Sequence, residues 1–304
     1  MPFAPFAGMT LTARRISKRN KQDVDLAGLL VETAQVMTAM HRWPDVFQAA
    51  IEHQHYFESH RVLLVTRELS EALYSSKIDF CLKYLRLPYS ICEICFEQGL
   101  KVPGTNIQAP GTLVVAKPSQ ASMDAMDRFM KKAAGNGLDM ESYRNIFSMR
   151  YVMDDETLPE GMNSTYAMNI DLTKNGEMEI EDVIRKAPDM EHVDATLNDE
   201  EKKNQAAIMK LVIGALCYLS IDNAEKEDAK VFDRPRMGVK PSCLILGKNY
   251  KEIARHMRKG HIRRLRHEKY KRDEDGNVRM VWVHEHEVGG AAEHLMEAKK
   301  ELMG

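Results

Sequence analysis

Residues 198–220 read Asn-Asp-Glu-Glu-Lys-Lys-Asn-Gln-Ala-Ala-Ile-Met-Lys-Leu-Val-Ile-Gly-Ala-Leu-Cys-Tyr-Leu-Ser. Asn198 is a favourable N-cap residue, and the three acidic residues after it lie where the helix dipole stabilises negative charge. Apolar side chains then recur at spacings of three and four and cover much of the helix circumference: Ile208, Leu211, Val212, Ala215, Leu216 and Leu219. This stretch therefore predicts a long helix at the centre of the core.

Strand patterns lie on both sides of this helix. Apolar or alternating runs predict strands at Tyr89–Phe96, Thr112–Ala116, Tyr143–Met153, Ser164–Leu172, Glu177–Ile184 and Ser242–Leu246. The Asn175-Gly176 pair predicts a hairpin that joins the fourth and fifth of these strands. Helical spacing is found over residues 24–76, 119–134 and 250–259. The predicted class is α+β: a helical N-terminal part, a central mixed β-sheet with helices packed on it, and a C-terminal basic β-hairpin.

The same patterns predict the domain organisation. Residues 1–23 are expected to form a basic flexible tail, and residues 24–80 a helical N-terminal region. Residues 81–304 are expected to form one α+β domain. It contains an acidic segment at 154–201, the core helix at 198–220 and the basic hairpin at 256–289.

Composition limits the class of protein. Among the 304 residues, 44% are hydrophobic, which is enough for a real core and excludes global disorder. The five cysteines are scattered and odd in number, as expected for reduced thiols rather than a disulfide framework. The first six residues lack the features of a secretory signal. The longest apolar run is about nine residues, against the roughly 20 that a membrane span needs. A cytoplasmic protein without membrane contact is expected.

No catalytic or cofactor signature is present. The chain contains neither a phosphate-binding loop, nor a nucleophile elbow, nor the His-Glu-x-x-His motif of metalloproteases. Non-enzymatic activity is therefore expected, with no catalytic residues, no metal and no cofactor. The acidic pair Asp154-Asp155 leaves a metal-dependent nuclease as a second alternative.

Three sets of metal-ligand residue types have ordinary explanations. Cys92 and Cys95 form a lone C-x-x-C on a predicted strand, where residues three apart point to opposite faces. His284 and His286 share one strand face but lack a third ligand. Four further histidines, His41, His53, His55 and His60, are expected on the surface or partly buried on helices rather than as ligands. His53 and His55 are expected to point to different helix faces.

Charge is strongly segregated along a chain whose formal net charge is only −2. Residues 251–272 hold ten Lys and Arg against two Glu, and a turn and a strand with Trp282 follow. We call residues 256–289 the basic ribbon; its candidate contact residues are Arg258, Lys259, His261, Arg263, Arg264, Arg266, Lys269 and Trp282. Arginine suits such a role because its planar guanidinium pairs with phosphate or carboxylate through two hydrogen bonds. Residues 154–201 hold fifteen acidic residues against three basic ones, so the ribbon has three candidate partners: this acidic segment, RNA, or an acidic protein.

The ribbon also resembles a known signature. His256-Met257-Arg258-Lys259-Gly260-His261-Ile262-Arg263-Arg264, followed by Arg279-Met280-Val281-Trp282-Val283 and Val288-Gly289, is similar to a C-terminal pattern of phage and plasmid proteins. That pattern runs H-x-R-R-G-H-W, then a loop, then a strand with R-x-x-W. Its best-known members are the second family of anti-CRISPR proteins directed at type V-A (Cas12a) immunity. Ile262 stands where the family has an aromatic residue, and the likeness covers about the last 100 residues.

The resemblance implies a protein of a mobile element that lowers the level of a host immune effector. It would do so without enzymatic activity, by engaging the effector polypeptide as it is made on its ribosome and messenger RNA. The alternative drawn from the residues alone is a sequence-tolerant RNA- or DNA-binding regulatory protein, with Trp282 packing beneath the ribbon or stacking on a base.

Overall fold

A computed structural model describes residues 3–4, 6, 8, 25–79, 81–85, 89–135, 143–154, 163–190, 198–220, 224, 226–229, 239–248, 261–264, 270 and 279–283. The predicted helix at 250–259 and the His284–Glu287 motif lie outside these residues.

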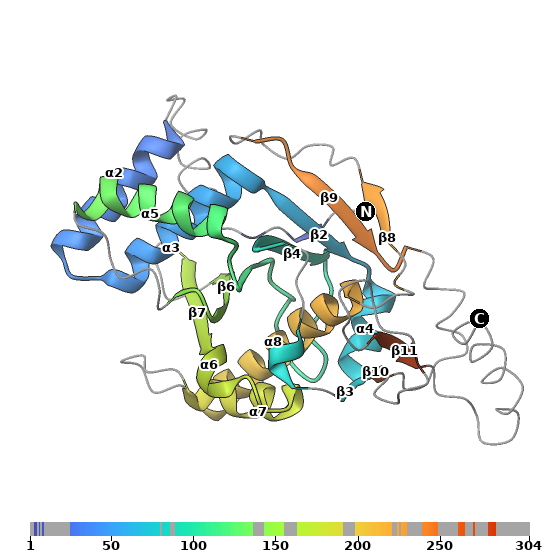
Figure 1. Cartoon of the computed structure of the whole chain (residues 1–304). Coiled ribbons are helices and arrows are strands. Elements are labelled where there is room, and N and C mark those ends of the chain that lie inside the picture. The colour runs from blue at the N-terminus through green and yellow to red at the C-terminus, as the bar shows by residue number, and fades with distance from the viewer. Residues whose placement is uncertain are drawn as a thin grey trace, which may run out of the picture.

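The main sheet is mixed, as predicted (Figure 1). Its strands are β1 (Phe3–Ala4), β2 (Arg61–Val65), β4 (Ile91–Glu97), β5 (Thr112–Ala116), β6 (Ile146–Asp154), β7 (Asn163–Asp171), β8 (Lys226–Ala229) and β9 (Ser242–Leu246). They lie in the order β7-β6-β5-β4-β2-β9-β8, with β1 beside β4. Strand β2 runs parallel to both β4 and β9, and the remaining pairs are antiparallel.

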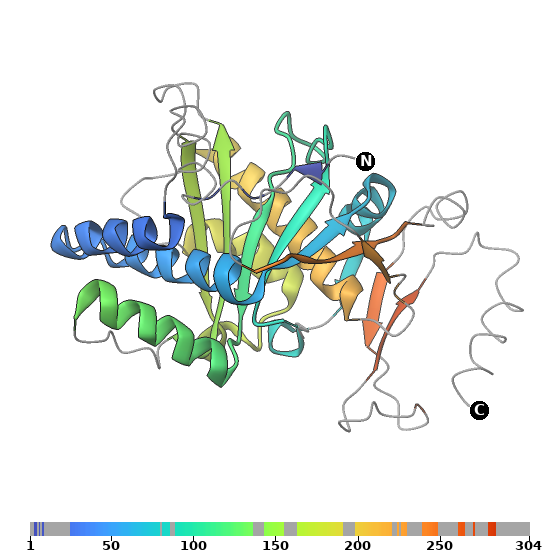
Figure 2. The same cartoon turned by 90° about the horizontal axis from the view of Figure 1, so that it is seen from above.

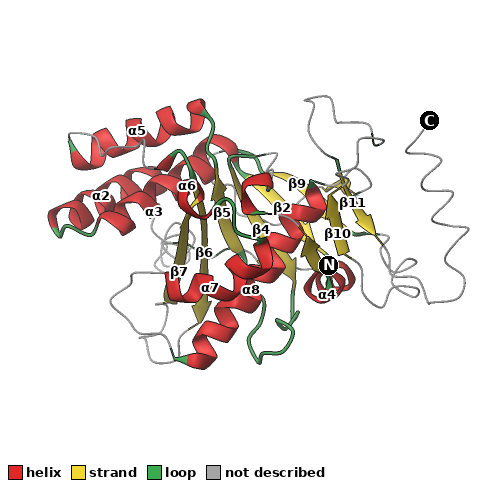
Figure 3. Cartoon of the chain, turned by 60° about the horizontal axis from the view of Figure 1, so that its bottom comes forward, coloured by secondary structure: helices red, strands yellow, loops and turns green. Residues whose placement is uncertain are grey.

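Helices cover both faces of this sheet (Figure 3). One core is built with α2 (Leu26–Ala39), α3 (Trp43–Gln54) and α5 (Gln120–Ala134). The other is built with α4 (Arg67–Ser75), α7 (Ile180–Met190) and α8 (Asp199–Leu219). Three short helices are also described: η1 (His55–Ser59), η2 (Leu82–Tyr84) and α6 (Leu172–Asn175). The α+β class is therefore confirmed.

Helix α8 is the central core helix that the sequence predicts. Asn198 and Glu201 form a reciprocal capping box: the Asn198 side chain accepts from the Glu201 amide at 2.9 Å, and the Glu201 carboxylate accepts from the Asn198 amide at 2.8 Å. Almost every residue from Ala207 to Leu219 is buried. Because Gly214 has no side chain, α8 approaches Leu73 of α4 closely.

Two predictions of local structure were wrong. Residues 61–65 form the buried strand β2 rather than helix, because Val62, Leu63, Leu64 and Val65 pair with β4 and β9 in the middle of the sheet. The hairpin across Asn175-Gly176 is absent among the described residues: the chain forms α6 and α7 there instead. Ile180, Val183 and Ile184 recur at helical spacing and are buried, so packing of this face overrides the local Asn-Gly turn signal.

A second, three-stranded sheet lies to one side of the main sheet (Figure 2). It has the order β11-β10-β3, with β3 (Lys77–Asp79), β10 (His261–Arg264) and β11 (Met280–Val283). Strand β10 pairs antiparallel with β11, so the two described strands of the predicted basic hairpin do pair. On its other side β10 runs parallel to β3.

No helix in the described ranges combines the length and apolar character needed to cross a membrane.

Candidate functional sites

Half of the predicted contact residues of the basic ribbon fall in described strands. His261, Arg263 and Arg264 are in β10, and Trp282 is in β11. The other four, Arg258, Lys259, Arg266 and Lys269, lie outside the described residues.

Strand register assigns the described ribbon residues to two faces. Ile262 is in register with Ile78 on one side and with Trp282 on the other. His261 is in register with Lys77 of β3 and Val283 of β11. In β3 itself, Ile78 is 1% exposed whereas Lys77 is exposed. Successive strand positions alternate between faces, so positions 261 and 263 fall on one face of this sheet and positions 262 and 264 on the other.

Described carboxylates of the acidic segment pair with basic side chains outside the ribbon. Glu177 is 2.5 Å from Lys83, and this hydrogen bond raises the pKa of the lysine. Glu181 lies 3.3 Å from Lys210 and accepts from the Ile78 amide at 3.1 Å. Asp182 pairs with Arg185 one turn along α7. The contacts of Glu177 and Glu181 join the acidic segment to its neighbours, and the Asp182–Arg185 pair lies within the segment.

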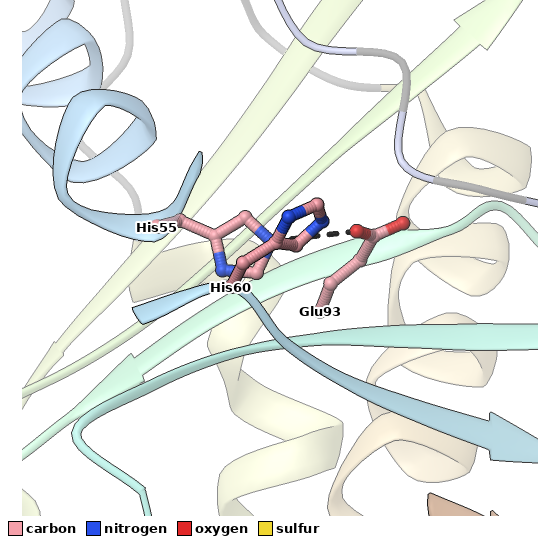
Figure 4. Close-up of side chains that lie close together, drawn as sticks. All are labelled: His55, His60 and Glu93. Carbon is pink, nitrogen blue, oxygen red and sulfur yellow. Dashed lines mark hydrogen bonds and ion pairs between the residues drawn. The ribbon is translucent and has the colours of Figure 1, made fainter. Parts of the chain in front are cut away.

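A buried cluster of two histidines and one glutamate was not predicted from the sequence. His55, His60 and Glu93 converge between β2, β4 and the end of α3 (Figure 4). Their exposed fractions are 0%, 2% and 0%. One ligand atom from each of the three side chains lies within 4.8 Å of the others.

Local backbone geometry creates this convergence. After α3 the chain continues into the π-helical turn η1, whose hydrogen bond runs from the His60 amide to the His55 carbonyl. His60 then adopts a left-handed conformation with φ of 36°, which is uncommon for a residue other than glycine. An α-helix rotates about 100° per residue, so residues five apart would diverge on a regular helix. The wider turn and the left-handed residue bring the two rings to a centroid separation of 5.1 Å.

Hydrogen bonds orient the cluster. Glu93 Oε1 accepts from the Phe6 amide at 2.8 Å and from the Cys95 thiol at 3.1 Å. Its other oxygen, Oε2, is 3.4 Å from His55 Nε2. His60 Nδ1 lies 3.0 Å from the carbonyl oxygen of Val239. Four segments that are distant in sequence therefore meet at one buried point.

The expectation for the histidines was partly wrong. His55 and His60 are fully buried rather than on the surface or partly buried, because the π-turn directs them into the sheet. His53 is half-buried, and burial lowers its pKa. It thus lies on a different side from His55, as the spacing predicted.

The C-x-x-C pair behaves as predicted. Cys92 belongs to the core beneath α8, and Cys95 to the small cluster on the opposite face of the sheet. Burial, with a smaller contribution from Glu93, raises the pKa of the Cys92 thiol to about 12. Two thiols on opposite faces cannot share a metal ion or form a disulfide.

Comparison with known proteins finds no sequence match and a weak structural likeness. No protein-family model matches the chain, and no curated protein matches it. The crystal structure of AcrVA2 aligns with 90% of this chain and 91% of that chain, at 10% identity and a TM-score of 0.34. AcrVA2 is an anti-CRISPR protein for type V-A. A likeness this weak carries no further conclusion for this chain.

Proposed function

We propose that this chain is a counter-defence protein of a phage or plasmid that acts by binding and without enzymatic activity. It engages a host immune effector polypeptide, or the ribosome and messenger RNA that produce it, in the host cytoplasm, and lowers the level of the effector. The basic ribbon is the contact surface. The proposal extends to all of its candidate residues, with His261 and Arg263 in the leading role.

The observation that carries this proposal is the register of β10. His261 is in register with the exposed Lys77 of β3, and Ile262 is in register with the buried Ile78 and with Trp282. In this proposal, positions 261 and 263 form the face on which the ribbon meets its partner, and pairing of β10 with β3 attaches the ribbon to its own domain. Such a surface suits a carboxylate-rich protein or a phosphate backbone.

The sequence signature supports the choice of partner. The residues that resemble the anti-CRISPR pattern, His261 and the arginines after it, are the residues that form β10. The described acidic segment also supports an outward-facing ribbon, since Glu177, Glu181 and Asp182 pair with Lys83, Lys210 and Arg185.

Affinity capture from host lysate tests the proposal. The full chain is compared with Arg263→Gln, which removes one charge from the ribbon without adding a carboxylate at the position in register with Asp79. Lys186→Gln is the matched control, because Lys186 is an exposed cation of α7 outside the ribbon. We expect a host protein to be captured by the wild type and by Lys186→Gln, and to be lost or strongly reduced with Arg263→Gln.

Nuclease treatment of the lysate separates the alternatives. Capture that survives nuclease supports a polypeptide target. Capture of RNA alone, with an affinity that falls steeply as salt rises, would replace the proposal with the sequence-tolerant nucleic-acid alternative. Equal capture by wild type and Arg263→Gln would remove β10 from the contact surface.

A further inference from the structure

We infer that His55, His60 and Glu93 form a binding site for a divalent transition-metal ion of the zinc class. The inference concerns the interior of the domain and does not depend on the proposed function of the ribbon.

The donor set and its spacing fit such an ion. Imidazole nitrogen and carboxylate oxygen are common zinc ligands, bound at about 2.0–2.2 Å. Two ligands at that length, held at a tetrahedral angle, lie roughly 3.4 Å apart. His55 Nε2 and Glu93 Oε2 are 3.4 Å apart, which is long for a hydrogen bond but equals this tetrahedral edge. The full set spans up to 4.8 Å, so ligation requires the side chains to close by roughly an ångström.

Outer hydrogen bonds prepare the ligands. A histidine that binds metal through one nitrogen usually donates from the other to a carbonyl or carboxylate, which fixes its tautomer. His60 Nδ1 lies 3.0 Å from the Val239 carbonyl, so Nε2 is the nitrogen through which His60 would bind the ion. The Phe6 amide and the Cys95 thiol hold Glu93 Oε1 and leave Oε2 directed at His55.

One buried polar atom remains to be explained. His55 is fully buried, and its Nδ1 makes no hydrogen bond with any residue that the structure describes. Buried polar atoms are nearly always satisfied, and an exception marks an unusual site. This Nδ1 is not the atom of the 3.4 Å pair with Glu93, so it marks the site without being the proposed ligand. The π-turn and the left-handed His60 also mark the site as a place where the backbone departs from regular geometry.

The burial of the cluster indicates a structural role for the ion. All three side chains are closed off from solvent, whereas a catalytic zinc keeps a position open to substrate. The fourth ligand that tetrahedral zinc needs would here be a water molecule enclosed with the ion. An ion here would join the N-terminal segment at Phe6, the end of α3, strand β4 and the segment at Val239. Metal of this kind is acquired as the chain folds.

Metal analysis of the purified full chain tests the inference. The protein is produced in zinc-containing medium, freed of any affinity tag, dialysed and analysed by mass spectrometry for metal content. We expect about one zinc per chain for the wild type, and more than ~100-fold weaker retention for Glu93→Gln and His60→Gln, since even outer-ligand changes cost 10–100-fold. His53→Gln is the matched control: it lies in α3, two residues before His55 and outside the cluster, and should retain the metal.

Two results would overturn the inference. One is a wild type that contains no zinc and takes up none when refolded with it. The other is equal zinc in the wild type, Glu93→Gln and His60→Gln. Should the variants fail to fold, the X-ray absorption spectrum of the zinc-loaded wild type decides instead. Two imidazole ligands are expected, and a spectrum without imidazole contradicts the site.

Discussion

Arg263 of β10 lies in register with Asp79 of β3. This register places a cationic position of the ribbon opposite the one acidic position of its neighbouring strand. Arg263 therefore has two roles to separate experimentally, one in attaching the ribbon and one in binding a partner.

Reversing the charge of Arg263 should weaken the small sheet. Like charges facing each other across strands are destabilising, and such pairs contribute ~0.2–1 kcal/mol. We expect Arg263→Glu to lower the free energy of unfolding by about this amount relative to Arg263→Gln. Adding Asp79→Asn should remove the difference. Urea denaturation measures the effect. Identical midpoints for Arg263→Glu, Arg263→Gln and the double variant Arg263→Glu/Asp79→Asn would show that the charges at these two positions do not affect stability.

Loss of the α8 cap should cost stability without changing the fold. The Asn198 side chain accepts from the Glu201 amide, and the Asn198 amide donates to the Glu201 carboxylate. We expect Asn198→Ala to destabilise the protein by ~1 kcal/mol. Lys203→Ala, an exposed position on the same helix, is the control and should change stability by less than ~0.5 kcal/mol. Equal losses for the two variants would contradict the capping role.

Buried thiols should react more slowly than the partly exposed one. Cys92, Cys95, Cys217 and Cys243 are buried, and Cys81 is partly exposed. With a pKa of about 12, only roughly one Cys92 thiol in ten thousand is ionised at pH 8, and the thiolate is the reactive form.

We therefore expect an alkylating reagent to modify Cys81 first in the native protein, with the buried thiols reacting only after unfolding. Peptide mass spectrometry identifies the labelled residue, and Cys81→Ser should abolish the fast phase. Labelling of native Cys92 at the same rate as Cys81 would mean that its strand opens readily.

Two glycines with positive φ allow backbone strain to be separated from crowding. Gly247 has φ of 73°, and an added Cβ would lie 2.7 Å from Leu69 Cβ. Gly135 has φ of 80° with nothing within 4 Å. We expect Gly135→Ala to cost ~1 kcal/mol from backbone strain alone. Gly247→Ala should cost at least ~1 kcal/mol more, because the packed Leu69 must move. Thermal unfolding compares the two variants, and equal losses would show that the contact at Leu69 relaxes freely.

The elements predicted correctly are those whose local signals agree with their environment. The helix after Asn198 has a cap, an acidic first turn and a continuous apolar stripe, and it packs in the core as the pattern requires. Strand β5 is bounded by glycine and proline and was predicted with its observed ends.

The errors arise where packing decides between equivalent patterns. Residues 61–65 are a short apolar run between helices, and periodicity alone cannot distinguish a buried strand from a helical segment. Ile180, Val183 and Ile184 had a visible helical spacing, but the Asn-Gly pair before them favoured a hairpin.

The buried cluster of His55, His60 and Glu93 could not be predicted from the sequence, for a different reason. His55 and His60 are five residues apart, a spacing that matches neither one face of an α-helix nor one face of a strand. Only a π-turn ending in a left-handed residue brings them together, and Glu93 comes from a strand more than thirty residues later. The ribbon could be found because its signal, dense positive charge followed by an alternating strand, is local.

The place of β2 between β4 and β9 has a consequence for synthesis. Thr66, at the end of β2, bonds to the Gly247 carbonyl, and 181 residues separate the two. During translation β9 is synthesised late, so the edge of β2 that pairs with β9 stays uncovered until then. Uncovered strand edges favour intermolecular pairing. Premature termination before Ser242 should thus yield insoluble fragments rather than a smaller folded unit.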